Sequence, residues 1–410
     1  MTRETVTRDA VTPLRDYRTR PDHLLVGLMT GTSADAVDAV LVRLKGDGLS
    51  ATHEVLAELE TPLESDLRAE VLAVASAKSL EPERIMRLDA ALGELYAESV
   101  RQVAGQAGVK LASIAAIGSH GQTVRHVPRA NGARALTLQL GSAPILAERT
   151  GVTVVSDFRR RDTAAGGEGA PLVPIADWWL FRSERESRVL LNLGGMANVT
   201  WLKKGGTLAD VVAFDTGPGN AVLDGLVRAG TRGLARHDES GGLAASGRAH
   251  EALLEELLAD PFFSRPPPRS TGRESFGEAY AERLADLAES LGITLEDALA
   301  TAVELTAVSI ERAVRDFLLP HGKVDVLYAS GGGVRNVTLM MALRRRLEGI
   351  RVERLDELGV SSGIKEALAF AFLAHLTLCG EPGNVPGATG AKHPVVLGSI
   401  TPGGPGGARG

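Results

Sequence analysis

Three acidic residues follow apolar runs or glycine turns, an arrangement that suits phosphate chemistry. Asp35 and Asp38 come after the turn 30–33, in which one glycine stands among three hydroxyl-bearing residues. Glycine lets backbone N–H groups approach an anion, hydroxyls add donors, and nearby carboxylates can hold a hydrated Mg²⁺. Asp215 follows the apolar run 211–214 and precedes a Gly-Pro-Gly turn. We therefore expect its carboxylate at a strand end, where it can act as a general base.

Each of these acids also has an ordinary structural interpretation. Gly, Thr, Ser and Asp are common in hairpin turns, Asp38 is compatible with a hairpin acid that binds nothing, and Asp215 with a helix cap. The phosphate-binding interpretation of the turn 30–33 is supported by two further glycine turns, at 215–220 and 331–333, which also follow apolar runs. These later turns precede predicted helices, whose amino ends carry unpaired N–H groups that attract anions. The sequence contains neither GxxxxGK[ST] nor GxGxxG, so a P-loop or Rossmann protein is not indicated.

The elements that must position these residues recur in the same order along the chain. Alternating apolar residues predict a hairpin from 24–29 and 37–44 and a third strand over 51–62. Helices over 63–108 and 143–149 and strands at 114–118, 136–140 and 152–155 follow, with polar turns at 119–123 and 157–162. The order then starts again with strands at 188–193, 198–202 and 208–214 and a helix from 221. A mostly helical section over 247–318 follows. The chain continues with a strand at 324–329, a helix from 337, a strand at 351–355 and a helix over 365–378. This repetition predicts a duplicated α/β architecture with a cleft between its halves.

Composition and charge narrow the class of protein. The chain has 410 residues, 44% of them hydrophobic, and a net charge of −6, which gives no electrostatic footprint for nucleic acid or an anionic membrane. No apolar run is long enough to span a bilayer, and the first residues lack the apolar core of a signal peptide. The single cysteine, Cys379, excludes an internal disulfide and is expected to be packed. We expect a cytoplasmic protein without nucleic-acid or membrane partners.

Seven ordered motifs identify the closest resemblance. They are TGTSADAVD, GSHGQTVRH, DFRRRDTAAGGEGAPLVP, NLGGMANVT, FDTGPGN, STGRESF and SGGGVRN, and they span about residues 24 to 400. The glycine turns resemble the ATP site of the actin, Hsp70 and sugar-kinase superfamily, and the series resembles the anhydro-N-acetylmuramic acid kinase family. Ala36 stands where that family usually has glycine, Thr30 where it has serine and Glu168 where it often has glutamine.

The resemblance implies a fold and its boundaries. It implies an α/β protein of two ribonuclease-H-like domains, the actin/Hsp70/sugar kinase fold, flanking an interdomain cleft for ATP and substrate. We place a flexible tail at 1–22, the first domain at 23–185, the second at 186–383 and an irregular tail at 384–410. The oligomeric state stays open between a monomer and a homodimer.

The resemblance also implies the reaction and its residues. ATP phosphorylates O6 of 1,6-anhydro-N-acetylmuramic acid while water opens the anhydro bridge, with Asp215 as the base and with Asp35 and Asp38 as candidates to hold Mg²⁺ through water. The implied ATP-binding residues are Gly31, Thr32, Ser33, Ala34, Asp35, Ala36, Val37, Asp38, Gly217, Gly219, Asn220, Gly331, Gly332 and Gly333. The implied substrate-binding residues are His120, Gln122, Arg159 and Asp162.

Several of these assignments have alternatives. His120 is compatible with a structural histidine, and of Arg159, Arg160 and Arg161 we expect one to meet the lactyl carboxylate of the sugar, the others being solvated. The glycines at 166, 167 and 169 form either a hinge or a fixed loop, and Asn336 either contacts ribose or caps a helix. An ordinary hexose or amino-sugar 6-kinase and an actin- or Hsp70-like ATPase remain competing functions.

Overall fold

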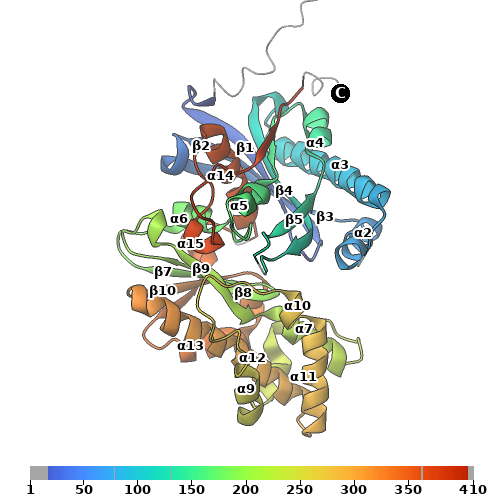
Figure 1. Ribbon diagram of the computed structural model, residues 1–410, viewed down its shortest axis with the longest axis vertical. Coiled ribbons are helices and arrows are strands. Elements are labelled where there is room, and N and C mark those ends of the chain that lie inside the picture. The colour runs from blue at the N-terminus through green and yellow to red at the C-terminus, as the bar shows by residue number, and fades with distance from the viewer. Residues whose placement is uncertain (1–16, 78, 131, 362, 405–410) are drawn as a thin grey trace, which may run out of the picture. The chain divides into compact units, whose positions relative to one another are not determined.

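The chain forms two compact units, each built around one mixed sheet. The structure, a computed structural model, describes residues 17–77, 79–130, 132–361 and 363–404. The first unit comprises Met1–Ala176 and Gly363–Gly410, and the second comprises Asp177–Ser362. Figure 1 labels their helices and strands.

The first sheet begins with the predicted hairpin. β1 (Asp22–Thr30) pairs antiparallel with β2 (Ala36–Lys45), and β2 pairs antiparallel with β3 (Thr52–Pro62). β4 (Ile114–Val127) then lies parallel to β1, and β6 (Val154–Ser156) lies parallel to β4. The hairpin and the third strand were predicted from their alternation, and both predictions are confirmed.

Two further strands extend this sheet beyond that core. β5 (Leu136–Leu140) pairs with β4, and β12 (Ser399–Thr401) pairs with β6, giving the order β12-β6-β4-β1-β2-β3. Because β5 pairs with the far half of β4, that strand continues through the predicted polar turn 119–123 to Val127. The expected turn is therefore wrong: the segment belongs to the strand, although Gly121 adopts a left-handed conformation at φ 76°.

Helices cover both faces of the first sheet. Val26 and Leu28 of β1 share a core with Leu92 and Val100 of α3 (Pro82–Gln106), beside α2 (Ser65–Ser76). Since side chains alternate along a strand, Gly27 points to the other face, where α14 (Lys365–Cys379) packs. The remaining helices of this unit are α4 (Ala143–Thr150), α5 (Phe158–Ala164) and α15 (Pro386–Thr389).

The second sheet repeats the plan of the first. β7 (Arg188–Leu193), β8 (Met196–Leu202) and β9 (Val212–Pro218) form an antiparallel series, and β10 (Val326–Ser330) and β11 (Arg351–Arg354) add in parallel beside β7. Numbered within each unit, the main strands of both sheets lie in the order 3-2-1-4-5. This is the ribonuclease-H-like topology, and its occurrence in both units confirms the predicted duplicated α/β fold.

The second unit is richer in helices than the first. Its longest helix, α12 (Leu295–Arg312), is buried along most of its length, and its N-cap Thr294 accepts a hydrogen bond from the Asp297 N–H at 3.2 Å. The other helices are α6 (Pro174–Phe181), which begins in the first unit, α7 (Asn220–Gly230), α8 (Gly242–Ser246), α9 (Glu251–Leu258), α10 (Arg273–Phe276), α11 (Glu278–Ser290) and α13 (Val337–Arg346). None of the helices in the described part of the chain has the length and apolarity needed to cross a membrane.

The unit boundaries differ from the predicted domain boundaries at the C-terminal side. We placed the last helix in a domain ending at 383, but α14 belongs to the first unit. The physical reason is a pair of glycines in adjacent strands: a Cβ at Gly27 would overlap the carbonyl of Ala367, and one at Gly118 would overlap that of Phe370. Only glycine lets this apolar helix lie so close to the sheet.

Both predicted tails are partly ordered. Residues 1–16 lie outside the described part, but Tyr17 is buried, and its hydroxyl is 2.8 Å from Nδ1 of His375. The segment from 384, expected to be irregular, contains α15 and β12. Residues packed in the first unit therefore occur before residue 23 and after residue 383, the boundaries of the predicted tails.

Candidate active site

The turn between β1 and β2 is compact and carries its hydroxyls outward. Ala34 donates its N–H to the Gly31 carbonyl at 3.0 Å and adopts a left-handed conformation with φ 52°. Ala34 is buried, whereas Thr32 is exposed and Ser33 partly exposed. The turn therefore keeps these two hydroxyls available to a ligand, as a phosphate-binding turn requires.

The two acids after this turn have different surroundings. Asp35 is largely exposed and forms an ion pair with Arg68 at 2.8 Å. Asp38 is half-buried, and burial, reinforced by Glu60 and Glu366, raises its pKa to about 7. Such an excess of negative charge would be relieved by a cation, so Asp38 fits the Mg²⁺ role better than Asp35, whose carboxylate is already neutralised.

No cluster of three or more acidic, histidine or cysteine residues in the described part could enclose a metal ion. This agrees with the way proteins usually bind Mg²⁺ at nucleotide sites, through one or two carboxylates, water and the phosphates. The donor set around Asp38 fits a hydrated ion of this kind.

His120 is a buried residue with both ring nitrogens engaged. Its Nε2 accepts a hydrogen bond from Nε of Arg159 at 3.0 Å, so the ring proton resides on Nδ1, which donates to the Gly121 carbonyl at 2.7 Å. Burial, with the nearby Arg159 charge, lowers the pKa of His120 well below its ordinary value. The neutral ring, which also packs on Phe370 with centroids 4.5 Å apart, therefore orients Arg159.

Arg159 differs from the two arginines that follow it. It is partly buried, and burial, opposed by Glu366, lowers its pKa to about 10, a value at which it remains charged at neutral pH. Arg160 is exposed and pairs with Asp157 at 3.2 Å, and Arg161 is also exposed. Arg159 is the only one of the three held by a buried partner.

Gln122 is a buried residue of β4, two residues after His120. It faces Thr30 across the β1–β4 pairing, and its Oε1 has no hydrogen-bond partner within the described residues. A buried amide oxygen without a donor is costly. A ligand hydroxyl or amide would satisfy it.

Asp162 has its carboxylate occupied by the protein. Oδ1 accepts hydrogen bonds from Asn384 Nδ2 at 2.7 Å and Thr389 Oγ1 at 2.8 Å, and Oδ2 accepts the Gly169 N–H at 2.8 Å. The residue is fully buried. This geometry favours a role in fixing the glycine loop 166–169 over direct contact with a sugar.

Asp215 lies in β9, the edge strand of the second sheet, and is clasped by a loop. Its Oδ2 accepts the Thr271 N–H at 2.8 Å, its N–H donates to the Arg269 carbonyl at 3.1 Å, and its own carbonyl accepts from Nε of Arg269 at 2.9 Å. Burial raises the pKa of Asp215 to about 6, although the Thr271 N–H and Arg269 oppose this. The carboxylate is thus held in one orientation and titrates near neutral pH, as a general base must.

The turn after Asp215 differs from expectation in one respect. The N–H groups of Gly219 and Ala221 donate to the Gly195 carbonyl at 3.0 and 3.1 Å, and that of Asn220 donates to the Gly194 carbonyl at 2.9 Å. The first N–H groups of α7 are therefore not free for a phosphate. The expectation of unpaired N–H groups at this helix start is wrong, because they are hydrogen-bonded to the carbonyls of the turn 194–195. That turn lies so close that a Cβ on Gly219 would be 2.5 Å from the Gly194 carbonyl oxygen.

The glycine turns of the second unit nevertheless lie together. Gly331, at φ 83°, and Gly333 both approach Leu193 so closely that a Cβ on either would clash with it, and Asn220 Nδ2 donates to the Leu193 carbonyl at 3.2 Å. The turns 217–220 and 331–333 thus meet at the end of β7. Asn336 caps α13 by accepting the Leu339 N–H at 2.9 Å, the second of the two alternatives for this residue.

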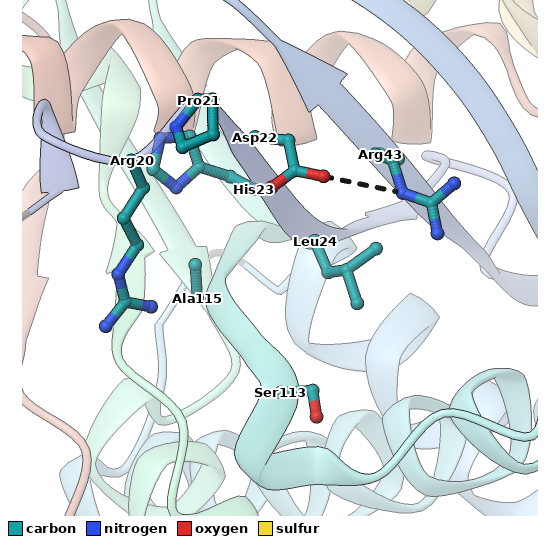
Figure 2. Close-up of a pocket in the computed structure, with 8 residues that line it drawn as sticks. All are labelled: Arg20, Pro21, Asp22, His23, Leu24, Arg43, Ser113 and Ala115. Carbon is teal, nitrogen blue, oxygen red and sulfur yellow. Dashed lines mark ion pairs between the residues drawn. The ribbon is translucent and has the colours of Figure 1, made fainter.

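A pocket in the first unit lies elsewhere. Figure 2 shows it at the beginning of β1, whereas the turn 30–35 follows the end of that strand. Its lining includes Arg20, His23 and an ion pair between Arg43 and Asp22 at 3.9 Å. None of the predicted site residues lines it.

Sequence reasoning did not single out Arg269 or Glu366. Arg269 lies in a proline-rich loop whose pairing with β9 has no local signal, and Glu366 starts a helix that we assigned to the other domain. Glu366 precedes an apolar helical run, a pattern that points to it, whereas the sequence around Arg269 carries no such signal.

The fold and these sites define a class of protein: a duplicated ribonuclease-H-like α/β protein with glycine turns of the nucleotide-binding kind. The model of the family described as anhydro-N-acetylmuramic acid kinase matches residues 23–403, and the chain belongs to this family.

Named relatives cover nearly the whole chain. The anhydro-N-acetylmuramic acid kinase of Caldanaerobacter subterraneus subsp. tengcongensis is 44% identical over 95% of this chain and 99% of its own length. The relative of the same name from Gloeobacter violaceus is 47% identical over 93% of this chain and 99% of its own. Among solved structures, the ROK hexokinase from Thermus thermophilus is similar with a TM-score of 0.34 and 19% identity, over 86% of this chain and 99% of that chain.

Proposed function

We propose that this chain uses ATP and water to convert 1,6-anhydro-N-acetylmuramic acid into N-acetylmuramic acid 6-phosphate and ADP, a step in peptidoglycan recycling. The observation that carries the proposal is the Asp215 carboxylate, oriented by the Thr271 N–H and with its pKa raised by burial to about 6. Membership of the family supplies the substrate, which is named in the relatives.

The substrate explains why a base is needed. O6 is tied to C1 in the anhydro sugar and carries no proton, so removal of a proton from O6 cannot start the reaction. Asp215 instead takes a proton from water as the water oxygen bonds to C1, the C1–O6 bond breaks, and O6 bonds to the γ-phosphorus of ATP with ADP leaving. The proton on Asp215 then passes to solvent, which completes the balance.

Three stretches of the chain are the candidates for contacts with ATP. In the first unit, Thr32 and Ser33 offer hydroxyls, and in the second, the turns 217–220 and 331–333 gather at the end of β7. Bound Mg²⁺, for which Asp38 is the best-fitting residue, supplies positive charge against the phosphates.

Arg159 is our choice for the lactyl carboxylate of the sugar. Its Nε is fixed by His120, and the described residues include no hydrogen-bond partner for its two terminal nitrogens. These nitrogens can bind a carboxylate. Gln122, with its unpaired Oε1, is the candidate for a sugar hydroxyl or the N-acetyl N–H, whereas His120 and Asp162 act on the sugar site through Arg159 and the loop 166–169.

One assay distinguishes this proposal from its rivals. ADP release is measured with 1,6-anhydro-N-acetylmuramic acid, with N-acetylglucosamine, with glucose and without sugar. We expect release with the anhydro sugar alone. Activity confined to a sugar with a free 6-hydroxyl would establish the ordinary 6-kinase, and rapid release without sugar would establish an ATPase. Because the reaction consumes ATP, we place it in the cytosol.

A further inference from the structure

Arg269 is a buried arginine next to the proposed base. Its side chain belongs to a residue that is 6% exposed, and among the described residues it forms no ion pair with a carboxylate within 4 Å. The guanidinium instead faces the rings of Phe214, Phe262 and Phe317, at 5.2, 4.9 and 5.0 Å from their centroids. Three aromatic faces stabilise a cation that is otherwise costly to bury.

The same guanidinium binds four backbone carbonyls. Nη1 donates to Phe262, Phe263 and Arg265 at 3.1, 3.1 and 2.7 Å, and Nε donates to Asp215 at 2.9 Å. Arg269 therefore ties the loop 262–265 to the strand that carries the base. Each of these bonds joins a charged donor to a carbonyl, which makes it stronger than a neutral hydrogen bond.

The backbone of the loop completes the clasp. β9 is the edge strand of its sheet, so one side of Asp215 has no strand partner. The Arg269 carbonyl accepts the Asp215 N–H at 3.1 Å, and the Thr271 N–H reaches the carboxylate two residues later. The loop thus fixes both the main chain and the side chain of Asp215.

Arg269 also supplies a positive charge that acts on this carboxylate. Burial, with the negative charge of Glu274, raises the pKa of Asp215, whereas the Thr271 N–H and the Arg269 charge lower it. Without the arginine, a larger fraction of Asp215 would carry a proton at neutral pH, and a protonated carboxyl cannot take a proton from water.

We propose that Arg269 is a positioning residue of the reaction, which orients Asp215 through its backbone and keeps the carboxylate ionised by its positive charge. This proposal rests on the proposed function, because it assigns Arg269 a role toward the base of that reaction. A purely structural arginine would affect folding and activity equally at every pH.

The test compares Arg269→Gln, Arg269→Lys and the wild type over pH 4.5 to 9. Arg269→Gln keeps hydrogen-bond donors but loses the charge, and we expect the acid limb of kcat to move upward by about one pH unit, the lower end of the effect of an adjacent arginine. Arg269→Lys keeps the charge and should leave the midpoint within about 0.3 units of the wild type. KM for ATP should stay within about twofold in both, since the contacts of Arg269 in the described residues involve neither 217–220 nor 331–333.

Arg265→Met is the matched control. Arg265 lies in the same loop and also contacts Phe262, but it is exposed and donates to the Ser270 carbonyl instead of Asp215. Its removal should leave the midpoint unchanged. If Arg269→Gln does not fold, as judged by circular dichroism, Arg269→Met provides a second uncharged side chain for the same measurement.

A readout without substrate separates this proposal from the proposed function. The titration of Asp215 is followed by NMR in protein labelled with ¹³C at the aspartate carboxyls, with the signal assigned through Asp215→Asn. An upward shift in the uncharged variant supports the role of Arg269 even if the sugar specificity proves different. An unchanged titration midpoint in that variant, with activity lost uniformly across pH, would overturn it.

Discussion

The pH dependence of the wild-type reaction follows from the environment of Asp215. Burial raises the pKa of this carboxyl from 3.8 to about 6. Since the base must be ionised, kcat/KM rises with pH and reaches half its plateau near pH 6. At pH 5 only about a tenth of Asp215 is ionised, whereas an unperturbed aspartate would be about nine-tenths ionised, so the structure predicts a roughly tenfold loss where an ordinary aspartate gives almost none.

The assay is steady-state ADP release with saturating Mg²⁺ and ATP, at constant ionic strength from pH 4.5 to 9. Asp38→Asn is the control because Asp38 is the other carboxyl with a strongly raised pKa, at about 7. This variant should bind ATP less well but keep the acid limb of kcat near pH 6. A midpoint near pH 4, or one that disappears in Asp38→Asn, would refute the assignment of the base.

Three further expectations concern stability. Gly27→Ala should lower the free energy of unfolding in urea by about 1 to 3 kcal/mol, because its Cβ overlaps the Ala367 carbonyl; Gly105→Ala, a helical position with nothing within 4 Å, should not destabilise the protein. Asp162→Ala should cost about 3 kcal/mol or more, since it leaves three buried donors unpaired, and wild-type stability would contradict that role. Burial lowers the pKa of His375 from 6.5 to about 4, so the unfolded chain binds the proton more readily and the free energy of unfolding falls as the pH drops from about 6.5 toward 4. The His375→Gln variant should lose less stability over this range. An equal loss of stability in the variant and the wild type would contradict this role of His375.

The strands could be predicted because their signals are local. The alternation in β1 and β2 and the apolar run before Asp215 each occupy fewer than about a dozen consecutive residues, which is the range over which periodicity operates. The duplicated fold could be predicted because the same order of strands and helices occurs twice along the chain.

The packing of α14 and the partners of Asp162 could not be predicted, because they depend on contacts between distant parts of the chain. α14 is apolar on all sides, so its sequence does not show which sheet it covers, and the decisive signal is the presence of Gly27 and Gly118 more than two hundred residues earlier. Asp162 meets Asn384 and Thr389, 222 and 227 residues away. No periodic pattern encodes such pairs.

The loop around Arg269 was missed for a related reason. Its residues look like a surface turn because prolines and arginines dominate it, yet it pairs with the edge strand β9. Its arginine meets one phenylalanine ring of the loop and two from elsewhere, Phe214 and Phe317. The mistaken expectation for the start of α7 has the same origin, since the N–H groups of that helix are paired with the turn 194–195 of a neighbouring hairpin.

The most direct test of the account is the turnover of Asp215→Asn with 1,6-anhydro-N-acetylmuramic acid. The amide is nearly isosteric with the carboxylate and can still accept the Thr271 N–H, so ATP binding should remain within a few-fold of the wild type. We expect kcat to fall by about 10² to 10⁴, the usual contribution of a general base, and the acid limb near pH 6 to vanish. Wild-type turnover in this variant would contradict the central claim that Asp215 activates the attacking water.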